Sequence, residues 1–338
     1  MTTPLRIALL GAGRIGQVHA RTIVQRVPSA RLVAIADPMP DAAANLAARF
    51  GVSTVSTDCL ALINNADIDA VMICTPTDTH AAYIKAAAAA GKHIFCEKPI
   101  ALDLAETDSA LAAVSAAGVT LQIGFNRRFD ANFVRMHQAV LDGTIGTPKI
   151  IHIISRDPAP PPISYIKVSG GIFLDMTIHD WDIARFLMGS DIEEVYVQGS
   201  VTVDPAIGAA GDIDTHVTVL RFANGAIGTI DNCRQAVYGY DQRAEIFGSA
   251  GSIETANNYP NNTTLSTANG VSRDLPLNFF MQRYAEAYAA EIESFVFAVT
   301  SGTPATVTGA DARKALIAGL AAWRSYYERR PVRLAEFE

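Results

Sequence analysis

The chain has 338 residues, of which 49% are hydrophobic and 18% charged, and its formal net charge is −7 at pH 7. Because single hydrophobic cores stop growing at about 250 to 300 residues, two domains are expected. The acidic balance and the lack of a basic run argue against a nucleic acid or an anionic membrane as partner. No apolar run approaches the ~20 residues that a membrane-spanning helix needs, so the expected partner is a small neutral or polar molecule.

Four cysteines are scattered along the chain, and two of them lie in apolar, strand-like segments. They form no Cys-x-x-Cys pair, so the sequence predicts neither a metal site nor a redox pair. Scattered reduced cysteines suit a reducing compartment. The first apolar segment begins near residue 5, which leaves no room for a signal peptide, and the sequence therefore predicts a cytoplasmic protein. The cysteines are Cys59, Cys74, Cys96 and Cys233.

Residues 5–37 have the pattern of a dinucleotide-binding unit: an apolar strand, a Gly-x-Gly-x-x-Gly turn, an amphipathic helix and a second strand. Each glycine meets a steric requirement. Gly11 allows the tight turn, Gly13 lets the backbone approach a pyrophosphate, and Gly16 lets the helix pack closely on the strand. The free N–H groups and the positive dipole end of the helix would then meet the phosphates.

Asp37 ends the second strand, 21 residues after Gly16. A carboxylate at this position can accept hydrogen bonds from the ribose hydroxyls of adenosine. It would repel a 2′-phosphate, and the Pro-Met-Pro segment at 38–40 offers no Arg or Lys to offset that repulsion. The pattern therefore predicts NAD rather than NADP. The alternative, a structural turn beside an ordinary surface aspartate, must explain the strand, the helix and the acid as coincidences.

Short apolar strands alternate with Ala-rich helices through the first third of the chain. This pattern predicts a Rossmann domain over residues 1–124, with a doubly wound parallel sheet and a ligand crevice at the carboxyl ends of its strands. Those ends carry the glycine turn, Asp37, a Thr-Pro turn after Cys74, and a Glu-Lys-Pro segment. The predicted cofactor-binding residues are Gly11, Gly13, Arg14, Ile15, Gly16, Asp37, Thr75, Pro76, His80, Glu97 and Lys98.

From about residue 125 the pattern changes. Several strands follow one another directly, and segments 215–222 and 225–232 alternate polar and apolar residues around a Gly/Asn turn, as antiparallel neighbours do. We expect residues 125–338 to form an α+β domain with a large, mixed, mostly antiparallel open-faced sheet. That sheet has room to cover the sheet of a second copy. The helices expected in this part lie near 130–142, 171–188, 278–300 and 308–328.

The expected helix at 171–188 carries a candidate general base. Asp175, His179 and Asp182 are spaced at i, i+4 and i+7, which places them on one face of a continuous helix. A carboxylate one turn from an imidazole can fix its tautomer and raise its basicity. Such a pair also occurs in protein cores, but alcohol oxidation by NAD needs a proton acceptor that the cofactor does not supply. His80 is the second candidate for that base.

Lys98 is the candidate for stabilising charge on a substrate oxygen. It ends a predicted strand, between Glu97 and Pro99, and the proline restricts it to extended geometry. Its ammonium group could hydrogen-bond the substrate oxygen and stabilise negative charge as the proton departs. The alternative is a surface lysine that precedes a turn.

Taken together, these segments resemble the glucose–fructose oxidoreductase/inositol dehydrogenase family, abbreviated Gfo/Idh/MocA, over essentially the whole chain. Two later segments are similar to its inositol 2-dehydrogenase branch: Tyr-Gly-Tyr-Asp at 238–241, and residues 280–288. The segments that carry the family resemblance are 11–16, 74–80, 97–99, 124–130 and 170–182.

The resemblance implies an NAD-dependent oxidation of a cyclic polyol, most simply myo-inositol to its 2-keto form. It implies that Lys98, Asp175 and His179 are catalytic, with His179 as the general base. These three residues, together with Arg127, Asp157 and Tyr238, are then the predicted substrate-binding residues.

Members of the family are commonly homotetramers joined through the open face of the second sheet, so the resemblance implies the same assembly. The identities of Asp157 and Met176 leave the inositol stereoisomer open. Two alternatives therefore remain. One is a scyllo-inositol or aldose dehydrogenase that uses the same residues, and the other is a non-catalytic, NAD-binding redox regulator.

Overall fold

The computed structural model describes residues 3–337 and divides the chain into two compact units. Of these residues, the first unit contains those up to Phe129 together with Glu286–Leu316, and the second contains Asp130–Ala285 together with those from Ile317 onward. The sequence placed a single division between residues 124 and 125. The two units differ from that division mainly because a late segment of the chain returns to the first unit, where its apolar side chains join the core.

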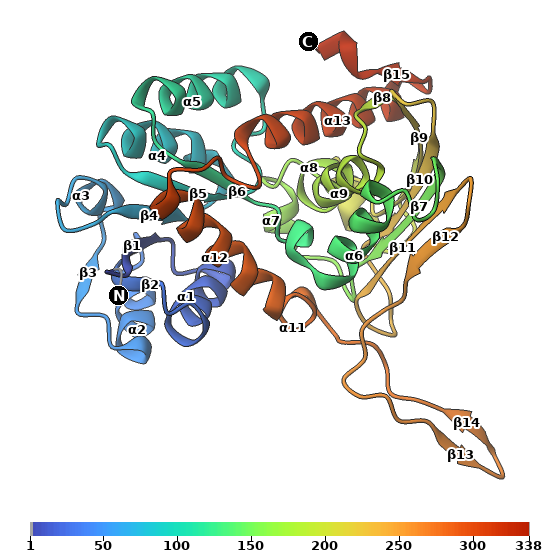
Figure 1. Cartoon of the computed structure of the whole chain (residues 1–338), viewed down its shortest axis with the longest axis horizontal. Helices are drawn as coiled ribbons and strands as arrows, with labels where there is room; N and C mark the ends of the chain where they lie inside the picture. The colour runs from blue at the N-terminus through green and yellow to red at the C-terminus, as the bar shows by residue number, and fades with distance from the viewer. Residues whose placement is uncertain (1–2, 338) are drawn as a thin grey trace. The chain divides into compact units, whose positions relative to one another are not determined.

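The first unit is built on a six-stranded sheet in the order β3-β2-β1-β4-β5-β6 (Figure 1). All of its pairings are parallel. The order reverses next to β1, which is the topological switch point at which doubly wound sheets bind ligands. The predicted Rossmann fold is therefore confirmed. The strands are β1 (Leu5–Leu10), β2 (Ala30–Ala36), β3 (Thr54–Ser56), β4 (Ala70–Ile73), β5 (His93–Glu97) and β6 (Leu121–Gly124).

Helices cover both sides of this sheet. The core includes apolar residues of α1, α2 and α12 together with those of β1, β2 and β4, and Figure 1 shows α4 and α5 on the opposite side. Within residues 3–337 there is no helix both long and apolar enough to cross a membrane. The helices of this unit are α1 (Arg14–Arg26), α2 (Pro40–Phe50), α3 (Cys59–Ile63), α4 (Thr77–Ala89), α5 (Leu104–Ala117), η1 (Asn126–Phe129) and most of α12 (Ala285–Ser301).

The second unit is built on a seven-stranded sheet in the order β12-β11-β7-β10-β9-β8-β15. All of its pairings are antiparallel except that of β7 with β10, so the expected mixed, mostly antiparallel sheet is confirmed. A separate hairpin is formed by β13 (Leu265–Thr267) and β14 (Gly270–Ser272). The strands of the large sheet are β7 (Pro148–Arg156), β8 (Ile192–Ser200), β9 (Thr215–Phe222), β10 (Ile227–Cys233), β11 (Asp241–Gly248), β12 (Ser252–Thr255) and β15 (Val332–Arg333).

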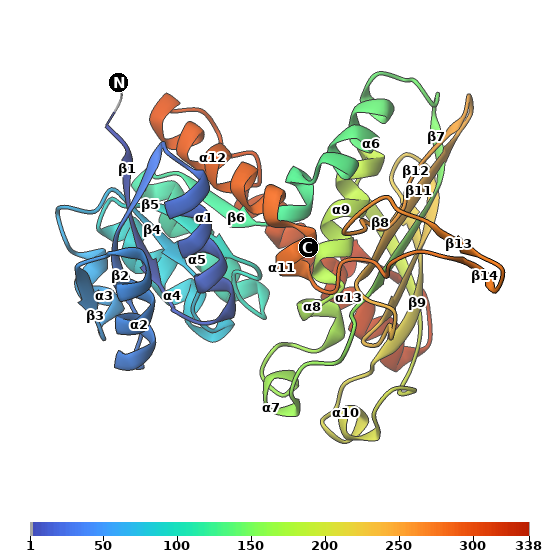
Figure 2. The ribbon, with the colours of Figure 1, turned by 90° about the horizontal axis from the view of Figure 1, so that it is seen from below.

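One face of the large sheet packs against helices, among them α6, α8, α9 and α13 (Figure 2). Burial alternates along the strands accordingly, with every second residue of β9 and β10 buried. The opposite face leaves apolar side chains such as Val217, Val219 and Ile227 almost half exposed. The helices of this unit are α6 (Ala131–Leu141), α7 (Ile163–Ile166), α8 (Ile172–Asp175), α9 (Ile178–Met188), α10 (Pro205–Ala209), α11 (Phe280–Arg283) and the later part of α13 (Gly309–Glu328).

The helix expected at 171–188 is interrupted. The Thr177 amide donates to the Ile172 carbonyl five residues earlier at 2.8 Å, and the Asp180 amide donates to the Thr177 carbonyl three residues earlier at 2.8 Å. A wide turn is therefore followed by a tight one. This break separates α8, which ends at Asp175, from α9, which contains His179. The i, i+4 spacing on one continuous helix consequently does not apply to these two residues.

Candidate active site

The glycine turn has the geometry that its sequence predicts. Gly11 has a φ of +97°, a backbone conformation that residues with a side chain rarely adopt. A Cβ at Gly16 would lie 2.0 Å from the carbonyl oxygen of Gly11, so this position tolerates no side chain. A Cβ at Gly13 would meet nothing within 4 Å. Gly13 and Arg14 are exposed and Ile15 is half-buried, so the start of α1 presents backbone N–H groups beside open space.

Asp37 is tied to this turn. Its carboxylate accepts hydrogen bonds from the amide of Ala12 at 2.7 Å and from the amide of Met39 at 2.8 Å. Asp37 is half-buried, and each carboxylate oxygen has a second lone pair for a further donor. The residues present therefore fit a dinucleotide: an open approach at Gly13, a helix N-terminus, and an acid fixed beside them.

The strand ends of the first unit meet at one edge, as predicted. The amide of Gly11 donates to the carbonyl of Ala36, and the amide of Cys74 donates to the carbonyl of Leu10. Thr75 follows Cys74 at this edge, and its hydroxyl lies 2.6 Å from that of Thr79. Thr75 is half-buried.

His80 is a poor candidate for the general base. It is buried, with Nδ1 2.7 Å from the carbonyl oxygen of Pro99 and Nε2 2.8 Å from that of Thr75. Burial lowers the pKa of His80. Both ring nitrogens are thus directed at backbone carbonyls, and the side chain links the turn after β4 to the segment that follows Lys98.

Glu97, the residue before Lys98, is turned into the protein. Its carboxylate lies 2.6 Å from Nε2 of the fully buried His19 on α1. Lys98 itself is half-buried. Lys98 lies in a bend just after the end of β5. Arg127, in η1 shortly after β6, is buried.

Asp175 in the second unit has two partners that the sequence did not indicate. The Tyr165 hydroxyl donates to its Oδ1 at 2.9 Å, and Arg234 Nη1 lies 3.3 Å from its Oδ2. Arg234 is fully buried and also contacts Asp212 through Nη2 at 3.3 Å. Burial raises the pKa of Asp212, although Arg234 opposes this shift. Asp175 and His179 are both half-buried.

A fully buried polar network anchors the break between α8 and α9. The Thr177 hydroxyl donates to Asn232 Oδ1 at 2.6 Å and lies 2.9 Å from His216 Nε2. Asn232 Nδ2 donates to Asp180 at 3.0 Å. Thr177 and Asp180 therefore both bind side chains of the sheet.

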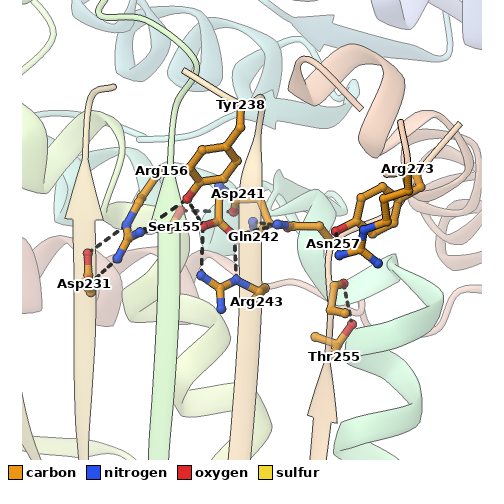
Figure 3. Close-up of polar contacts among 12 residues, drawn as sticks. Ser155, Arg156, Asp231, Tyr238, Asp241, Gln242, Arg243, Thr255, Asn257 and Arg273 are labelled. Carbon is orange, nitrogen blue, oxygen red and sulfur yellow. Dashed lines mark hydrogen bonds and ion pairs between the residues drawn. The ribbon is translucent and has the colours of Figure 1, made fainter. Parts of the chain in front are cut away.

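Asp157 and Tyr238 lie at the same end of the large sheet. The Asp157 amide donates to the carbonyl of Cys233 at 3.0 Å, just beyond the paired ends of β7 and β10. The Tyr238 hydroxyl donates to Asp241 at 2.6 Å and contacts Arg156, which pairs with Asp231; Figure 3 shows these contacts. The backbone of Asp157 is thus tied to the end of β10, next to Arg234, whereas the Tyr238 hydroxyl contacts Arg156, whose partner Asp231 alternates with the buried Asn232 and lies on the other face of the sheet.

Comparisons with known proteins agree with both units. Residues 5–125 match a protein family described as an oxidoreductase family with an NAD-binding Rossmann fold. Residues 133–254 match a family described as the GFO/IDH/MocA C-terminal domain. Myo-inositol 2-dehydrogenase of Thermotoga maritima is 48% identical over 332 residues, covering 98% of this chain and 99% of its own.

Two solved structures have the same fold. A probable dehydrogenase from Thermotoga maritima superposes with a TM-score of 0.97 at 48% identity, covering 99% of this chain and all of its own. A scyllo-inositol dehydrogenase from Lactobacillus casei, solved with NAD(H) and scyllo-inositol, superposes with a TM-score of 0.92 at 30% identity, covering 98% of this chain and all of its own.

Proposed function

Because this chain belongs to the Gfo/Idh/MocA family of NAD-dependent oxidoreductases, we propose that it oxidises myo-inositol to the 2-keto-inositol scyllo-inosose. The observation that carries this substrate is the 48% identity to a myo-inositol 2-dehydrogenase over nearly the full length of both chains. The reaction removes a proton from a hydroxyl group and a hydride from the carbon that bears it.

The proposal assigns one role to each of three residues. His179 takes the proton from the hydroxyl group as the general base. Asp175 supports His179 electrostatically, because a carboxylate favours the imidazolium that forms. Lys98 donates a hydrogen bond to the same oxygen and stabilises the negative charge that develops on it. The half-buried position of all three residues leaves them accessible to a small substrate.

The residues around the glycine turn would hold the cofactor. The N–H groups at the start of α1 would bind the pyrophosphate, and Asp37 the adenosine ribose. When bound, NAD supplies the hydride acceptor. The other proposed contacts are Arg14, Ile15, Thr75, Pro76, His80, Glu97 and Lys98. Of these, His80 has both nitrogens directed at backbone carbonyls, so its contribution would be to shape the turn at Thr75.

Substrate contacts are proposed for Arg127, Asp157 and Tyr238 in addition to the catalytic residues. The relative from Lactobacillus casei, which was solved with scyllo-inositol, keeps that stereoisomer as the second candidate substrate. Asp157 and the buried Met176 are the positions at which we expect a preference between the two inositols to be decided.

We further propose a cytoplasmic homotetramer joined through the open face of the large sheet. Val217, Val219, Ile227 and Phe247 are each almost half exposed on that face. Apolar side chains gathered in this way mark an interaction surface. Light scattering coupled to size-exclusion chromatography measures the mass directly, and a monomer of 36.0 kDa at micromolar concentration would refute the assembly.

Initial rates of NADH formation with NAD, and of NADPH formation with NADP, test the proposed function. The substrates are myo-inositol, scyllo-inositol, glucose and xylose. We expect the highest kcat/KM with myo-inositol and NAD, and a fall in kcat of about 10²-fold or more when His179 is replaced by Ala. A preference for another polyol would refute myo-inositol as the substrate. Unchanged turnover in the His179→Ala variant would refute His179 as the general base. No turnover by protein that still binds NAD would favour a regulator.

A further inference from the structure

We propose that the end of strand β10 and the residue after it position the catalytic pair: Asn232, in the strand, holds the residues on both sides of His179, and Arg234, just past the strand, holds Asp175. This inference rests on the proposed function, which makes Asp175 and His179 catalytic. It assigns to Arg234, Asn232 and their partners no contact with substrate or cofactor, so they are positioning residues.

The contact between Arg234 and Asp175 joins a fully buried guanidinium to a partly buried carboxylate. The Arg234 side chain is 0% exposed and that of Asp175 is 14% exposed. Arg234 also faces Asp212, whose Oδ1 accepts hydrogen bonds from the amides of Ile172 and Ile213. Asp212 is thus fixed by the backbone and fixes Arg234 in turn. Arg234 then presents Nη1 to Asp175 in a defined place, at the end of α8.

A directional chain of hydrogen bonds holds the residues around His179. Thr218 Oγ1 lies 3.0 Å from His216 Nδ1, and His216 Nε2 lies 2.9 Å from Thr177 Oγ1. Thr177 donates to Asn232 Oδ1, and Asn232 Nδ2 donates to Asp180. The last acceptor is the side chain of Asp180. An ionised carboxylate accepts hydrogen bonds but cannot donate them.

This chain of bonds has one consistent direction. Burial lowers the pKa of His216 to about 3, so its ring is neutral and carries one N–H. The Thr177 hydroxyl donates over its shortest contact, to Asn232 Oδ1 at 2.6 Å rather than to the Ile172 carbonyl at 3.1 Å, and its oxygen can then accept from His216 Nε2. Nδ1 is then the acceptor for Thr218. Each donor in the series has an acceptor, and a fully satisfied buried network specifies a single arrangement.

The network acts on His179 through the backbone. Thr177 lies two residues before His179 and Asp180 lies one residue after it, and both are fully buried against the sheet. The backbone at His179 is therefore held from both sides at the point where the helix is broken. General bases act only in a narrow range of positions, and a misplacement of about 1 Å can cost ~10²-fold in rate.

Two pairs of variants test the inference. Arg234→Gln removes the charge facing Asp175, and Arg234→Lys retains it. Thr177→Val removes the hydroxyl at nearly constant volume, and Thr177→Ser retains it. For Arg234→Gln and Thr177→Val we expect kcat to fall ~10-fold to 10²-fold, with the KM for NAD within about twofold of wild type because the proposed cofactor-binding residues are untouched. The Lys and Ser variants should recover most of kcat.

A deuterium isotope effect separates positioning from general damage. With myo-inositol deuterated at the reacting carbon, the isotope effect on kcat should increase in Arg234→Gln and Thr177→Val, because the chemical step becomes slower relative to product release. Arg283→Gln is the control, since it breaks a buried ion pair with Asp130 in the same unit. It should lower the melting temperature and leave kcat and the isotope effect unchanged.

The outcomes distinguish this inference from the proposed function. If His179→Ala keeps wild-type turnover, the proposed function fails in its choice of base. If His179→Ala loses turnover while Arg234→Gln and Thr177→Val, folded by their melting temperatures, keep wild-type kcat, only the positioning role is overturned. Loss of kcat in the Lys and Ser variants as large as in the Gln and Val variants would also overturn it.

Discussion

His19 Nε2 lies 2.6 Å from Glu97 Oε1 inside the first unit, one residue before Lys98. A second carboxyl group, that of Glu291 on α12, is also fully buried there. Neither of its oxygens has a hydrogen-bond partner among the described residues. Burial, reinforced by the charge of Glu97, raises the pKa of Glu291 well above its ordinary value. The folded protein therefore holds the Glu291 proton to a higher pH than the unfolded chain does.

Replacing Glu291 by Gln should stabilise the protein at neutral and alkaline pH. The unfolded chain loses the Glu291 proton above a pH of about 4.3, whereas the folded chain keeps it, so wild-type stability falls with rising pH by about 1.4 kcal/mol per unit from this group. Gln removes that loss. Urea unfolding of the two proteins should give equal free energies near pH 4 and an increasing advantage for Glu291→Gln up to the folded-state pKa.

Glu293→Gln is the matched control for this prediction. Glu293 is exposed on the same helix, so its replacement should leave stability and its pH dependence almost unchanged. If the free energies of unfolding of wild type and Glu291→Gln differ by the same amount from pH 4 to pH 8, Glu291 ionises in the folded state as it does in the unfolded chain.

Replacing Gly13 should impair NAD binding, whereas replacing Gly16 should impair folding stability. Gly13→Ala should fold normally, because its Cβ meets no atom within 4 Å, but should bind NAD much more weakly, because the Cβ occupies the approach of the pyrophosphate. Gly16→Ala should be unstable, since its Cβ would lie 2.0 Å from the Gly11 carbonyl oxygen. Melting temperature and NADH fluorescence titration measure the two effects separately.

A Gly13→Ala protein that binds NAD as tightly as wild type would place the pyrophosphate elsewhere. Gly51→Ala provides a reference for backbone strain alone, because Gly51 has a φ of +68° at the end of α2 and its Cβ would also meet nothing. We expect this variant to lose about 1 kcal/mol of stability and to keep its affinity for NAD.

Asp37 should determine the choice between the two nicotinamide cofactors. Asp37→Ser removes the charge that would repel a 2′-phosphate, so the ratio of kcat/KM for NAD to that for NADP should fall by at least ~10-fold. The affinity for NAD should fall as well, because the amides of Ala12 and Met39 lose their acceptor. An unchanged ratio would mean that Asp37 only braces the turn.

Sequence was sufficient wherever local pattern dictates structure. The turn at Gly11, the acid at Asp37 and the parallel strands follow from steric requirements within a single βαβ unit. Arg234 could not be found in this way, because its partner Asp175 lies 59 residues away in the sequence. A weak signal existed: Asn232 and Arg234 continue the buried alternation of β10 with polar residues, which marks polar contacts inside the core.

The break between Asp175 and His179 was missed for a related reason. The residues from 171 to 188 have helical spacing throughout, and nothing local requires an interruption. The broken pattern of backbone bonds at Thr177 coincides with side-chain bonds to His216 and Asn232, which lie 39 and 55 residues away. Tertiary hydrogen bonds that follow from the arrangement of the sheet thus override the local preference.

His216 should make the protein sensitive to acid. Its pKa falls to about 3 in the folded state, whereas in the unfolded chain it is about 6.5. The stability that neutral His216 contributes is therefore fully present above pH 6.5 and is lost as the pH falls towards 3, at about 1.4 kcal/mol per unit.

The His216→Gln variant tests this prediction, because its side chain cannot take up a proton. The variant should be less stable than wild type at pH 7.5, because it loses part of the contact with Thr177 and Asn232. By pH 5 that deficit should shrink by about 2 kcal/mol, and measuring both proteins at the same pH cancels the titration of all other groups. A deficit that is the same at both pH values would show that folding does not lower the pKa of His216, so that the ring takes up a proton by pH 5 in the folded protein as well.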